Sequence, residues 1–270
     1  MVEKQAGNNS NVEILVSDNL STDETAKYVK KLTKRYRNLR YHCHEENIGG
    51  DRNFLSIYLN AKGKFALALG DDDNLENHVI DNVLDILEKN SNISLLQLLH
   101  QGGSDKVILG KTVSSYMKKV SFNSTFISGL IFNTDLLKMI PELDAEMNSS
   151  FNQVYLTLSL IKKYESYGIL CGQIFRSDSG AHNSSVYSLG ERFIQRYLDI
   201  IKKYASLTKE ELSQEKKKLL EGMILPWCVL AKEGKCSLIT GDIFKYYDQY
   251  YKNEEYYIAG KSKLKEILGV

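Results

Sequence analysis

The first hundred residues alternate between short apolar runs, typical of buried strands, and longer amphipathic patterns, typical of helices. The apolar runs cover residues 12–17, 39–44, 64–69 and 93–99. Between them, apolar side chains recur at helical intervals within residues 22–37, 54–61 and 79–87. This order predicts crossover connections and a mostly parallel sheet with helices on both faces. We therefore predict an α/β fold whose ligands bind at the carboxyl ends of the strands.

The first predicted helix carries a start signal. Ser21 and Glu24 have the spacing of a capping box, in which each side chain hydrogen-bonds the backbone at the other residue. We therefore expect Ser21 to cap a helix over residues 22–37. A glycine-containing stretch, "NIGGDRN" at residues 47–53, lies between a predicted strand and a predicted helix and is expected to form a loop.

Composition excludes several classes of protein. The 35 Lys and Arg residues nearly balance 34 Asp and Glu, so no strong positive field favours nucleic acid as a partner. The four cysteines lie far apart without a C-x-x-C pair, which favours reduced thiols over disulfides or zinc. The apolar run at 224–231 is too short to span a bilayer, and no signal segment opens the chain. These features predict a cytoplasmic protein.

Carboxylates follow two of the predicted strands. Asp18 comes at the end of the first strand, and Asp71–Asp73 come directly after the third. In one interpretation, Asp73 or Asn74 caps a helix that begins near Glu76. In the other, the acids bind Mn²⁺ or Mg²⁺, which proteins typically hold with one or two carboxylates and substrate phosphates. Like charges about 4 Å apart in water repel by about 1 kcal/mol, and a cation reverses that sign.

Other devices for phosphate chemistry are missing from the sequence. It contains no G-x-x-x-x-G-K-[ST] loop and no G-x-G-x-x-G turn opening a helix after a strand. It also lacks a G-x-S-x-G nucleophile turn. If the ligand carries phosphate, a metal ion is therefore expected to neutralise it.

Three motifs in order resemble the first half of a family 2 glycosyltransferase of the GT-A fold. They are "VEILVSDNLSTDET" from Val12, "NIGGDRN" from Asn47 and "AKGKFALALGDDDNL" from Ala61, and the resemblance covers about residues 12–99. The acidic "GDDD" resembles the D-x-D motif of that family. A looser resemblance, "SGLIFNTDLL" at residues 128–137, matches a later strand and helix. The implied fold is a nucleotide-diphospho-sugar transferase sheet, Rossmann-like and flanked by helices.

The resemblance implies roles for individual residues. Asp18 would approach the nucleobase of a sugar-nucleotide donor, and Asn47 and Arg52 would support the nucleotide. Asp71 would lie by the ribose or the metal, and Asp73 would bind the metal that bridges the diphosphate. The expected cofactor is Mn²⁺ or Mg²⁺, which would stabilise the departing nucleoside diphosphate as a Lewis acid.

Two departures from the family pattern affect these expectations. The family opens with a strand and helix that residues 1–11 are too short to contain, so we expect its central first strand to be lacking here. An open place in a sheet leaves backbone groups unpaired, which predicts rearrangement or a homodimer. The second departure is the start of a later helix, where Asn152 and Gln153 stand at the position of the family's acidic pair. An amide cannot act as a general base, and Asp144 or Glu146 is a substitute by reach alone. The alternative, which we favour, is that both are solvated acids of a loop.

Histidines offer two further candidates. His182, in "SDSGAHNSSVY", lies where related enzymes often place a histidine near the metal, although a histidine in a polar loop is more often simply exposed. His42 and His44 flank Cys43 on a predicted strand and point to one face. Further zinc ligands are missing nearby, so we interpret them as a packed pair.

The last third of the chain is rich in Lys, Glu and Tyr and shows helical patterns, so we divide the chain into a GT-A-like domain at 1–187 and a helical extension at 188–270. Six tyrosines lie between Tyr246 and Tyr257. Mixed with lysines, they could rest on the inner face of a membrane, giving peripheral contact with lipid-linked acceptors. The alternative, which we favour, is a helical cap whose tyrosines pack over the sheet domain.

The leading hypothesis is a metal-dependent, inverting glycosyltransferase that moves a sugar from a nucleotide donor to a glycan or lipid-linked acceptor. The alternative is a non-catalytic remnant of the same fold that binds nucleotide or a partner chain. A nucleotidyltransferase would also place acids at a sheet edge, but it needs a basic phosphate loop that the sequence does not show. Donor sugar, nucleobase and linkage depend on pocket shape, which the sequence does not fix.

Overall fold

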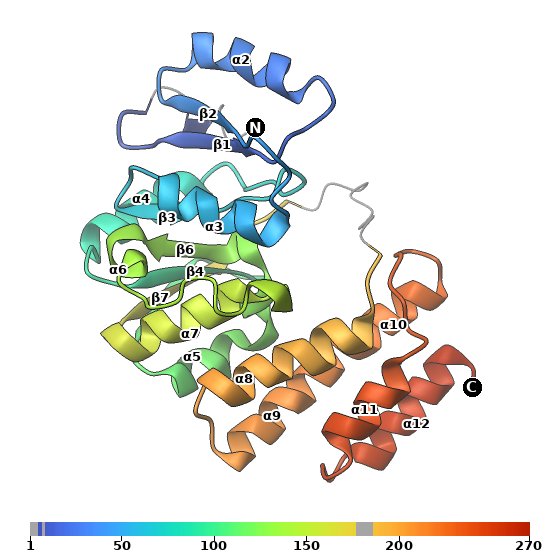
Figure 1. The fold of residues 1–270 in the computed structure, drawn as a ribbon. Coiled ribbons are helices and arrows are strands. Elements are labelled where there is room, and N and C mark those ends of the chain that lie inside the picture. The colour runs from blue at the N-terminus through green and yellow to red at the C-terminus, as the bar shows by residue number, and fades with distance from the viewer. Residues whose placement is uncertain (1–4, 7–8, 177–185) are drawn as a thin grey trace.

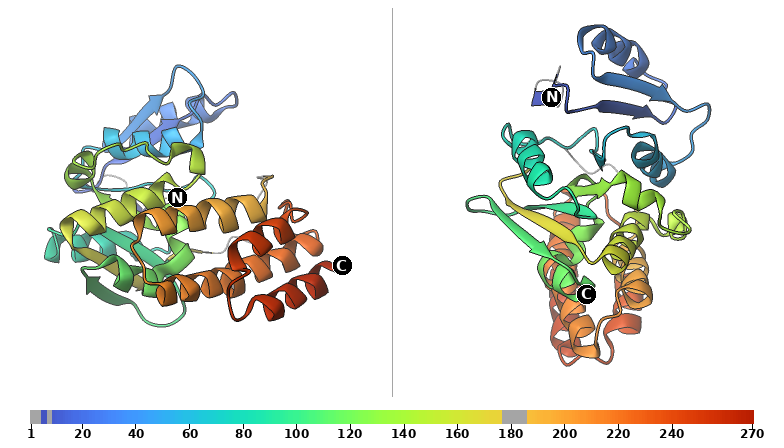
Figure 2. Two further views of the ribbon diagram at one scale, coloured as in Figure 1. Left: turned by 60° about the horizontal axis from the view of Figure 1, so that its bottom comes forward. Right: turned by 90° about the vertical axis from the view of Figure 1, so that its left-hand side faces the viewer.

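A computed structural model of the chain describes residues 5–6, 9–176 and 186–270. Within these ranges the strands and helices form layers, with β1 and β2 at one end of the molecule and the C-terminal helices at the other (Figures 1 and 2). The strands are β1 (Ile14–Asp18), β2 (Leu39–Cys43), β3 (Phe65–Leu67), β4 (Leu95–His100), β5 (Lys106–Gly110), β6 (Leu130–Asn133) and β7 (Tyr167–Gly172). The first-half helices are α2 (Thr25–Arg35), α3 (Gly50–Asn60), α4 (Val79–Lys89), α5 (Val113–Val120), α6 (Thr134–Lys138) and α7 (Asn152–Tyr164). Three 3-10 turns, η1 (Ser121–Thr125), η2 (Ile127–Gly129) and η3 (Met147–Ser149), complete this part.

The strands form two sheets. β1 and β2 pair in parallel, and the larger sheet has the order β3-β6-β4-β7-β5. In it only β4 and β7 are parallel, while β6 runs antiparallel to β3 and β4, and β5 antiparallel to β7. The α/β class is confirmed, but the sheet is mixed, so the predicted mostly parallel arrangement holds only for two pairings. The link from β4 to β5 contains no helix, and the chain reverses its direction there. The helical crossovers predicted for the first part of the chain therefore end at β4.

The two sheets do not join. Among the described residues, β1 pairs only with β2, and β3 pairs only with β6. Helix α3 contacts both β1 and β3 and so connects the sheets from one side. In the part of the chain that the structure describes, each of these two strands therefore has one unpaired edge.

The side chains of β4 alternate between two cores, as the period of a strand requires. Leu96 and Leu98 pack with the buried residues of α4, whereas Leu95 and Leu99 pack with those of α5 and α7. Helices therefore cover both faces of the larger sheet. This arrangement places the loops that follow the strands at the sheet's open ends, where a site can form.

The start of α2 differs from the prediction. The helix begins at Thr25, and the side chain of its N-terminal flanking residue, Glu24, makes no capping hydrogen bond. The backbone N–H of Ser21 instead donates to the Asp18 carboxylate at 2.7 Å, and that of Thr25 donates to Asp23 at 2.9 Å. The prediction of a capping box at Ser21 was wrong. The Asp18 carboxylate accepts the Ser21 backbone N–H, and Ser21 lies outside the helix.

The C-terminal region is helical, and its core is continuous with the core beneath α7. Four of the six tyrosines, Tyr246, Tyr247, Tyr250 and Tyr251, are buried, as the packed-cap interpretation predicts. No helix in the described ranges has the length and apolarity needed to cross a membrane. The helical segments are η4 (Gly190–Tyr197), α8 (Leu198–Tyr204), α9 (Lys209–Leu219), η5 (Leu220–Ile224), α10 (Leu225–Lys232), α11 (Ile243–Tyr251) and α12 (Tyr257–Leu268).

Candidate active site

The acidic turn after β3 is organised by a serine from a distant segment. The Ser128 hydroxyl, in η2, donates to Asp73 Oδ2 at 2.6 Å and accepts from the Gly70 N–H at 2.9 Å. Ser128 is fully buried, whereas Asp71 and Asp72 are exposed and Asp73 lies between these extremes. The turn is thus fixed at one end by Ser128 and presents its other carboxylates to solvent.

The electrostatic state of this turn suits a cation. Burial, the largest influence, raises the pKa of Asp73 above its ordinary value; the Ser128 hydrogen bond lowers it, and Asp72 and Asp71 raise it again by repulsion. Burial and mutual repulsion both disfavour the ionised carboxylates of this turn, so a bound cation that neutralises them would stabilise the fold.

The capping interpretation of the acids is wrong. Helix α4 begins at Val79, and His78 rather than Asp73 or Asn74 is its N-terminal flanking residue. The Asp73 carboxylate is instead bonded to Ser128. Helix capping therefore does not explain why these acids stand together.

The donor set of the turn fits a hard divalent cation. A Cβ built on Gly70 would lie 2.9 Å from Asp72 Oδ1 and 3.0 Å from Asp73 Oδ2, so both carboxylate oxygens converge on the space that glycine leaves open. The described residues contain no group of three or more His, Cys, Asp or Glu arranged for a metal. Two carboxylates with substrate phosphates are the usual set for Mg²⁺, so the remaining ligands would come from the donor or from beyond these residues.

The segment after β7 lies beside the acidic turn. Leu75 forms an antiparallel bridge with Phe175, and the Arg176 N–H donates to the Asn74 carbonyl at 2.8 Å. The predicted metal ligand His182 lies outside the described residues, six positions after Arg176. The described part of the chain thus brings Arg176 next to Asn74, the residue that follows Asp73.

Asp18 is buried at the end of β1. Its Oδ2 accepts from the Tyr41 hydroxyl at 2.5 Å and its Oδ1 from the Ser21 N–H at 2.7 Å. Burial, the largest influence, opposes ionisation, but these hydrogen bonds outweigh it and hold the pKa of Asp18 below its usual value. The carboxylate is therefore ionised at neutral pH and can act only as an acceptor.

The glycine loop is tied to the same strand end. The Asn19 amide donates to Asn47 Oδ1 at 2.9 Å, and Asn19 Oδ1 accepts from the Ile48 N–H at 2.9 Å. Arg52 is exposed on the first turn of α3. The structure thus brings Asp18 and Asn47 to neighbouring turns, with Arg52 on the helix that follows.

The predicted histidine pair at the end of β2 is a packed pair. The rings of His42 and His44 meet edge to face with centroids 4.7 Å apart. His44 Nε2 lies 3.1 Å from Asn53 Oδ1 and 3.4 Å from Ser17 Oγ. These contacts with α3 and β1 account for the pair without a zinc ion.

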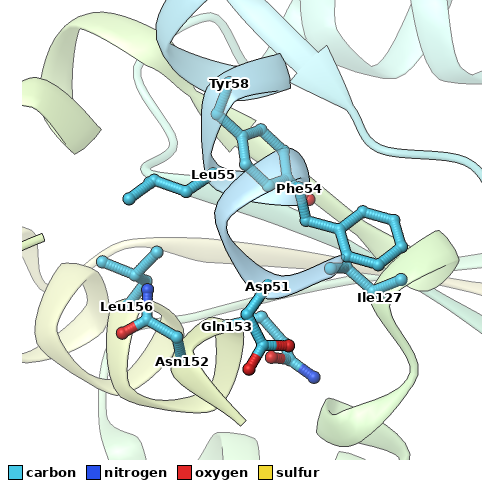
Figure 3. Close-up of a pocket in the computed structure, with 8 residues that line it drawn as sticks. All are labelled: Asp51, Phe54, Leu55, Tyr58, Ile127, Asn152, Gln153 and Leu156. Atoms are coloured by element: carbon cyan, nitrogen blue, oxygen red, sulfur yellow. The ribbon is translucent and has the colours of Figure 1, made fainter. Parts of the chain in front are cut away.

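A pocket opens between α3, η2 and the start of α7 (Figure 3). The Asp51 carboxylate and the Gln153 amide lie at the same end of it, and apolar side chains form its walls. The amide of Gln153 also donates to the Thr125 carbonyl at 2.9 Å. The lining residues are Asp51, Phe54, Leu55, Tyr58, Ile127, Asn152, Gln153 and Leu156.

Sequence reasoning missed Asp51, Asp72 and Ser128 as site residues, although the first two stand within recognised motifs.

The two predicted substitute bases lie elsewhere. Asp144 is exposed on the loop before η3. Glu146 accepts from Lys203 Nζ and the Tyr204 hydroxyl, each at 2.7 Å, so it joins this loop to α8. Asn152 Oδ1 accepts from the Glu146 N–H at 3.2 Å and closes the same loop.

Known proteins share part of the sequence and the fold of this chain. Residues 2–134 match the family model described as glycosyl transferase family 2. TarS of S. aureus, residues 1–349, is similar in structure with a TM-score of 0.54 and 16% identity, over 99% of this chain and 82% of that chain. Its complex with UDP-GlcNAc has a TM-score of 0.54 and 16% identity, over 99% of this chain and 83% of that chain. The mannosyltransferase PcManGT from Pyrobaculum calidifontis, in complex with GDP-Man and Mn²⁺, has a TM-score of 0.51 and 11% identity, over 95% of this chain and 75% of that chain. No curated protein sequence matches the chain.

The two kinds of likeness carry different weight. At such low identities the structural neighbours establish the fold, whereas the family match covers the residues that form the acidic turn, the glycine loop and the Asp18 turn. Residues 2–134 belong to glycosyltransferase family 2, and the chain has the GT-A fold of its solved glycosyltransferase neighbours.

Proposed function

We propose that the protein transfers a sugar from a nucleotide-diphosphate-sugar donor to the hydroxyl group of a glycan or lipid-linked acceptor, with a divalent metal and with inversion at the anomeric carbon. The observation that carries this proposal is the acidic turn, in which Ser128 anchors Asp73 while carboxylates converge over Gly70. The neighbours solved with UDP-GlcNAc and with GDP-Man and Mn²⁺ support a donor of this class.

In this proposal Asp71 and Asp73 hold Mn²⁺ or Mg²⁺, with His182 as a further ligand. The metal, when bound, would neutralise charge that develops on the departing diphosphate. Ser128 orients Asp73 through its hydroxyl. On the nucleotide side, the ionised Asp18 would accept a hydrogen bond from the nucleobase, and Asn47 and Arg52 would contact the nucleotide.

The assembly of the chain is part of the same proposal. Residues 188–270 would form a helical extension that packs on the catalytic domain at 1–187. The free edges of β1 and β3 favour pairing with a second copy, because unpaired backbone groups seek partners. Peripheral membrane contact would bring a lipid-linked acceptor to the site, whereas the burial of four tyrosines supports packing of that part of the extension.

Calorimetric titration with UDP-GlcNAc and with GDP-mannose, each with and without Mn²⁺, tests this function. We expect tighter binding with Mn²⁺ and loss of that gain in Asp73→Ala. Asp81→Ala is the matched control, because Asp81 is an exposed acid on α4. Donor affinity that depends neither on Mn²⁺ nor on Asp73 would defeat the proposal.

A second candidate is a protein that binds nucleotide without transferring sugar. The separation of the two sheets and the amides at the start of α7 favour it. Release of free sugar or nucleotide from the donor separates the candidates, since a binding protein would take up the donor and leave it intact.

A further inference from the structure

The start of α7 carries Asn152 and Gln153, and neither amide can take a proton from an acceptor hydroxyl. The pocket at this helix end nevertheless contains a carboxylate, because α3 places Asp51 opposite Gln153 (Figure 3). The two side chains come from segments about a hundred positions apart in the sequence. An acid is therefore present at this helix end, supplied by a different element.

The Asp51 pocket adjoins the proposed metal site. Ile127 lines the pocket, and the next residue, Ser128, hydrogen-bonds Asp73. Gln153 is fixed to the same segment through the Thr125 carbonyl. Two successive residues of η2 thus touch the two sites, which suits a reacting hydroxyl group at the pocket and a donor diphosphate at the acidic turn.

The surroundings of Asp51 make its carboxylate basic. Burial, the largest influence, raises the pKa of Asp51, and it outweighs the opposing attraction of Arg192 and Arg196 and a hydrogen bond from the Ser150 backbone. These arginines lie on η4 and are the charged groups that face Asp51; the pocket residues of α7 are neutral. Within the described residues, Arg192 Nε is buried without a hydrogen-bond partner. The second arginine, Arg196, is already bonded to the Glu191 carboxylate and the Asn148 carbonyl.

We propose that Asp51 is the general base of the transfer reaction, an assignment that rests on the proposed function. An Asp51 oxygen takes the proton of the acceptor hydroxyl as the acceptor oxygen forms its bond to the anomeric carbon. The bond between that carbon and the diphosphate breaks, and its electron pair leaves with the nucleoside diphosphate. Asp51 returns the proton to solvent after the product leaves.

This assignment accounts for the two sequence-based candidates. Glu146 is engaged by Lys203 and Tyr204 and braces a loop against α8. Asp144 is exposed and is absent from the pocket lining. Unlike these two acids, Asp51 lines the pocket formed in part by η2, the segment whose Ser128 holds the acidic turn.

Water can replace an unidentified acceptor in the test. Hydrolysis of UDP-GlcNAc and GDP-mannose with Mn²⁺ is compared for wild type, Asp51→Asn and Asp144→Asn. Asp81→Asn is the matched control, because Asp81 is the first-turn acid of a helix with the same length as α3. We expect Asp51→Asn to lower turnover by about 10²–10⁴-fold, the usual contribution of a general base, with donor affinity unchanged. Unchanged turnover in this variant, or loss in Asp144→Asn instead, would overturn the assignment.

Two further measurements separate catalysis from a structural ion pair. Because burial raises the pKa of Asp51, its ionised form is disfavoured in the folded protein, and Asp51→Asn should keep or raise the melting temperature. If Asp51 instead served to hold Arg192 in an ion pair, Asp51→Asn would lower the melting temperature, and that result would overturn the proposal. In Asp51→Ala, added formate should restore part of the turnover, because a small carboxylate can occupy the space and accept the proton.

The experiment also separates this assignment from the proposed function. Wild-type protein that binds donor with Mn²⁺, but whose turnover is unaffected by Asp51→Asn, retains the function and refutes the base. Wild-type protein that binds neither donor refutes both.

Discussion

Replacing Ser128 by alanine tests how the acidic turn is held. The change removes a hydroxyl that donates to Asp73 at 2.6 Å and accepts from the Gly70 N–H at 2.9 Å. A hydrogen bond to a charged group contributes about 1.5–3 kcal/mol, and we take the lower end because Asp73 is only half-buried. With about 1 kcal/mol for the unpaired Gly70 N–H, unfolding free energy should fall by about 2.5 kcal/mol at neutral pH.

The pH dependence makes this prediction specific. The pKa of Asp73 is already raised by burial, and loss of the Ser128 donor raises it further. The part of the loss that comes from the carboxylate is present at neutral pH. It disappears as pH falls through the raised pKa of the wild-type residue, because Asp73 is then protonated in both proteins. Urea unfolding of wild type and variant at neutral and acidic pH measures both parts.

Ser124→Ala is the matched control. Ser124 is buried as completely as Ser128, but its hydroxyl donates to the neutral Ser121 carbonyl at 2.8 Å. It should lose about 1 kcal/mol at every pH. If Ser128→Ala costs no more than this control at neutral pH, or costs the same in acid, then Ser128 does not stabilise an ionised Asp73 and the reasoning fails.

Three further substitutions test other parts of the structure. Gly70→Ala places a Cβ 3.0 Å from Oδ2 of the proposed metal ligand Asp73, so Mn²⁺-dependent donor binding should weaken by about 10-fold in calorimetry, as expected for a displaced ligand; unchanged binding would show that Asp73 does not hold the metal. Tyr41→Phe removes a donor from Asp18, whose pKa is lowered in the fold, so the loss of stability should be complete at neutral pH and fade as pH falls below the ordinary pKa of an aspartate; an equal loss in acid, measured by urea unfolding, would contradict it. Gly260→Ala places a Cβ 2.2 Å from the Tyr247 hydroxyl and should cost about 1–3 kcal/mol in thermal unfolding, whereas Gly241→Ala, which meets nothing within 4 Å, should be neutral; equal effects would argue against tight packing of α11 on α12.

The first half of the fold was predictable because its signals are local. Apolar runs and helical periodicity located β1 to β4 and the three helices between them, since burial of one face fixes the pattern in the sequence itself. The directions of β5 and β6 were not predictable in this way. They depend on which strands lie side by side, and antiparallel pairing with β7 or with β3 and β4 leaves no mark on a single strand.

The site shows the same division. Its carboxylates Asp18 and Asp71–Asp73 stand in motifs at the ends of strands, so their clustering at sheet edges could be predicted. Ser128 lies 55 positions from Asp73, and a serine before a strand carries no signal that it will bond a carboxylate. Likewise, the sequence could show that the start of α7 lacks acids, but only the packing of α3 on η3 and the pocket lining identified another acid nearby.

Asp51 illustrates why position within a helix is insufficient to assign a role. An acid in the first turn of a helix normally gains from the helix dipole, which favours its ionised form and explains its presence through stability. In Asp51 burial has the opposite effect and raises the pKa, even with two arginines nearby. The ionised residue therefore weakens the fold at neutral pH instead of stabilising it. A raised pKa together with a place in the pocket that shares η2 with the acidic turn suits proton transfer from an acceptor hydroxyl better than a stabilising role.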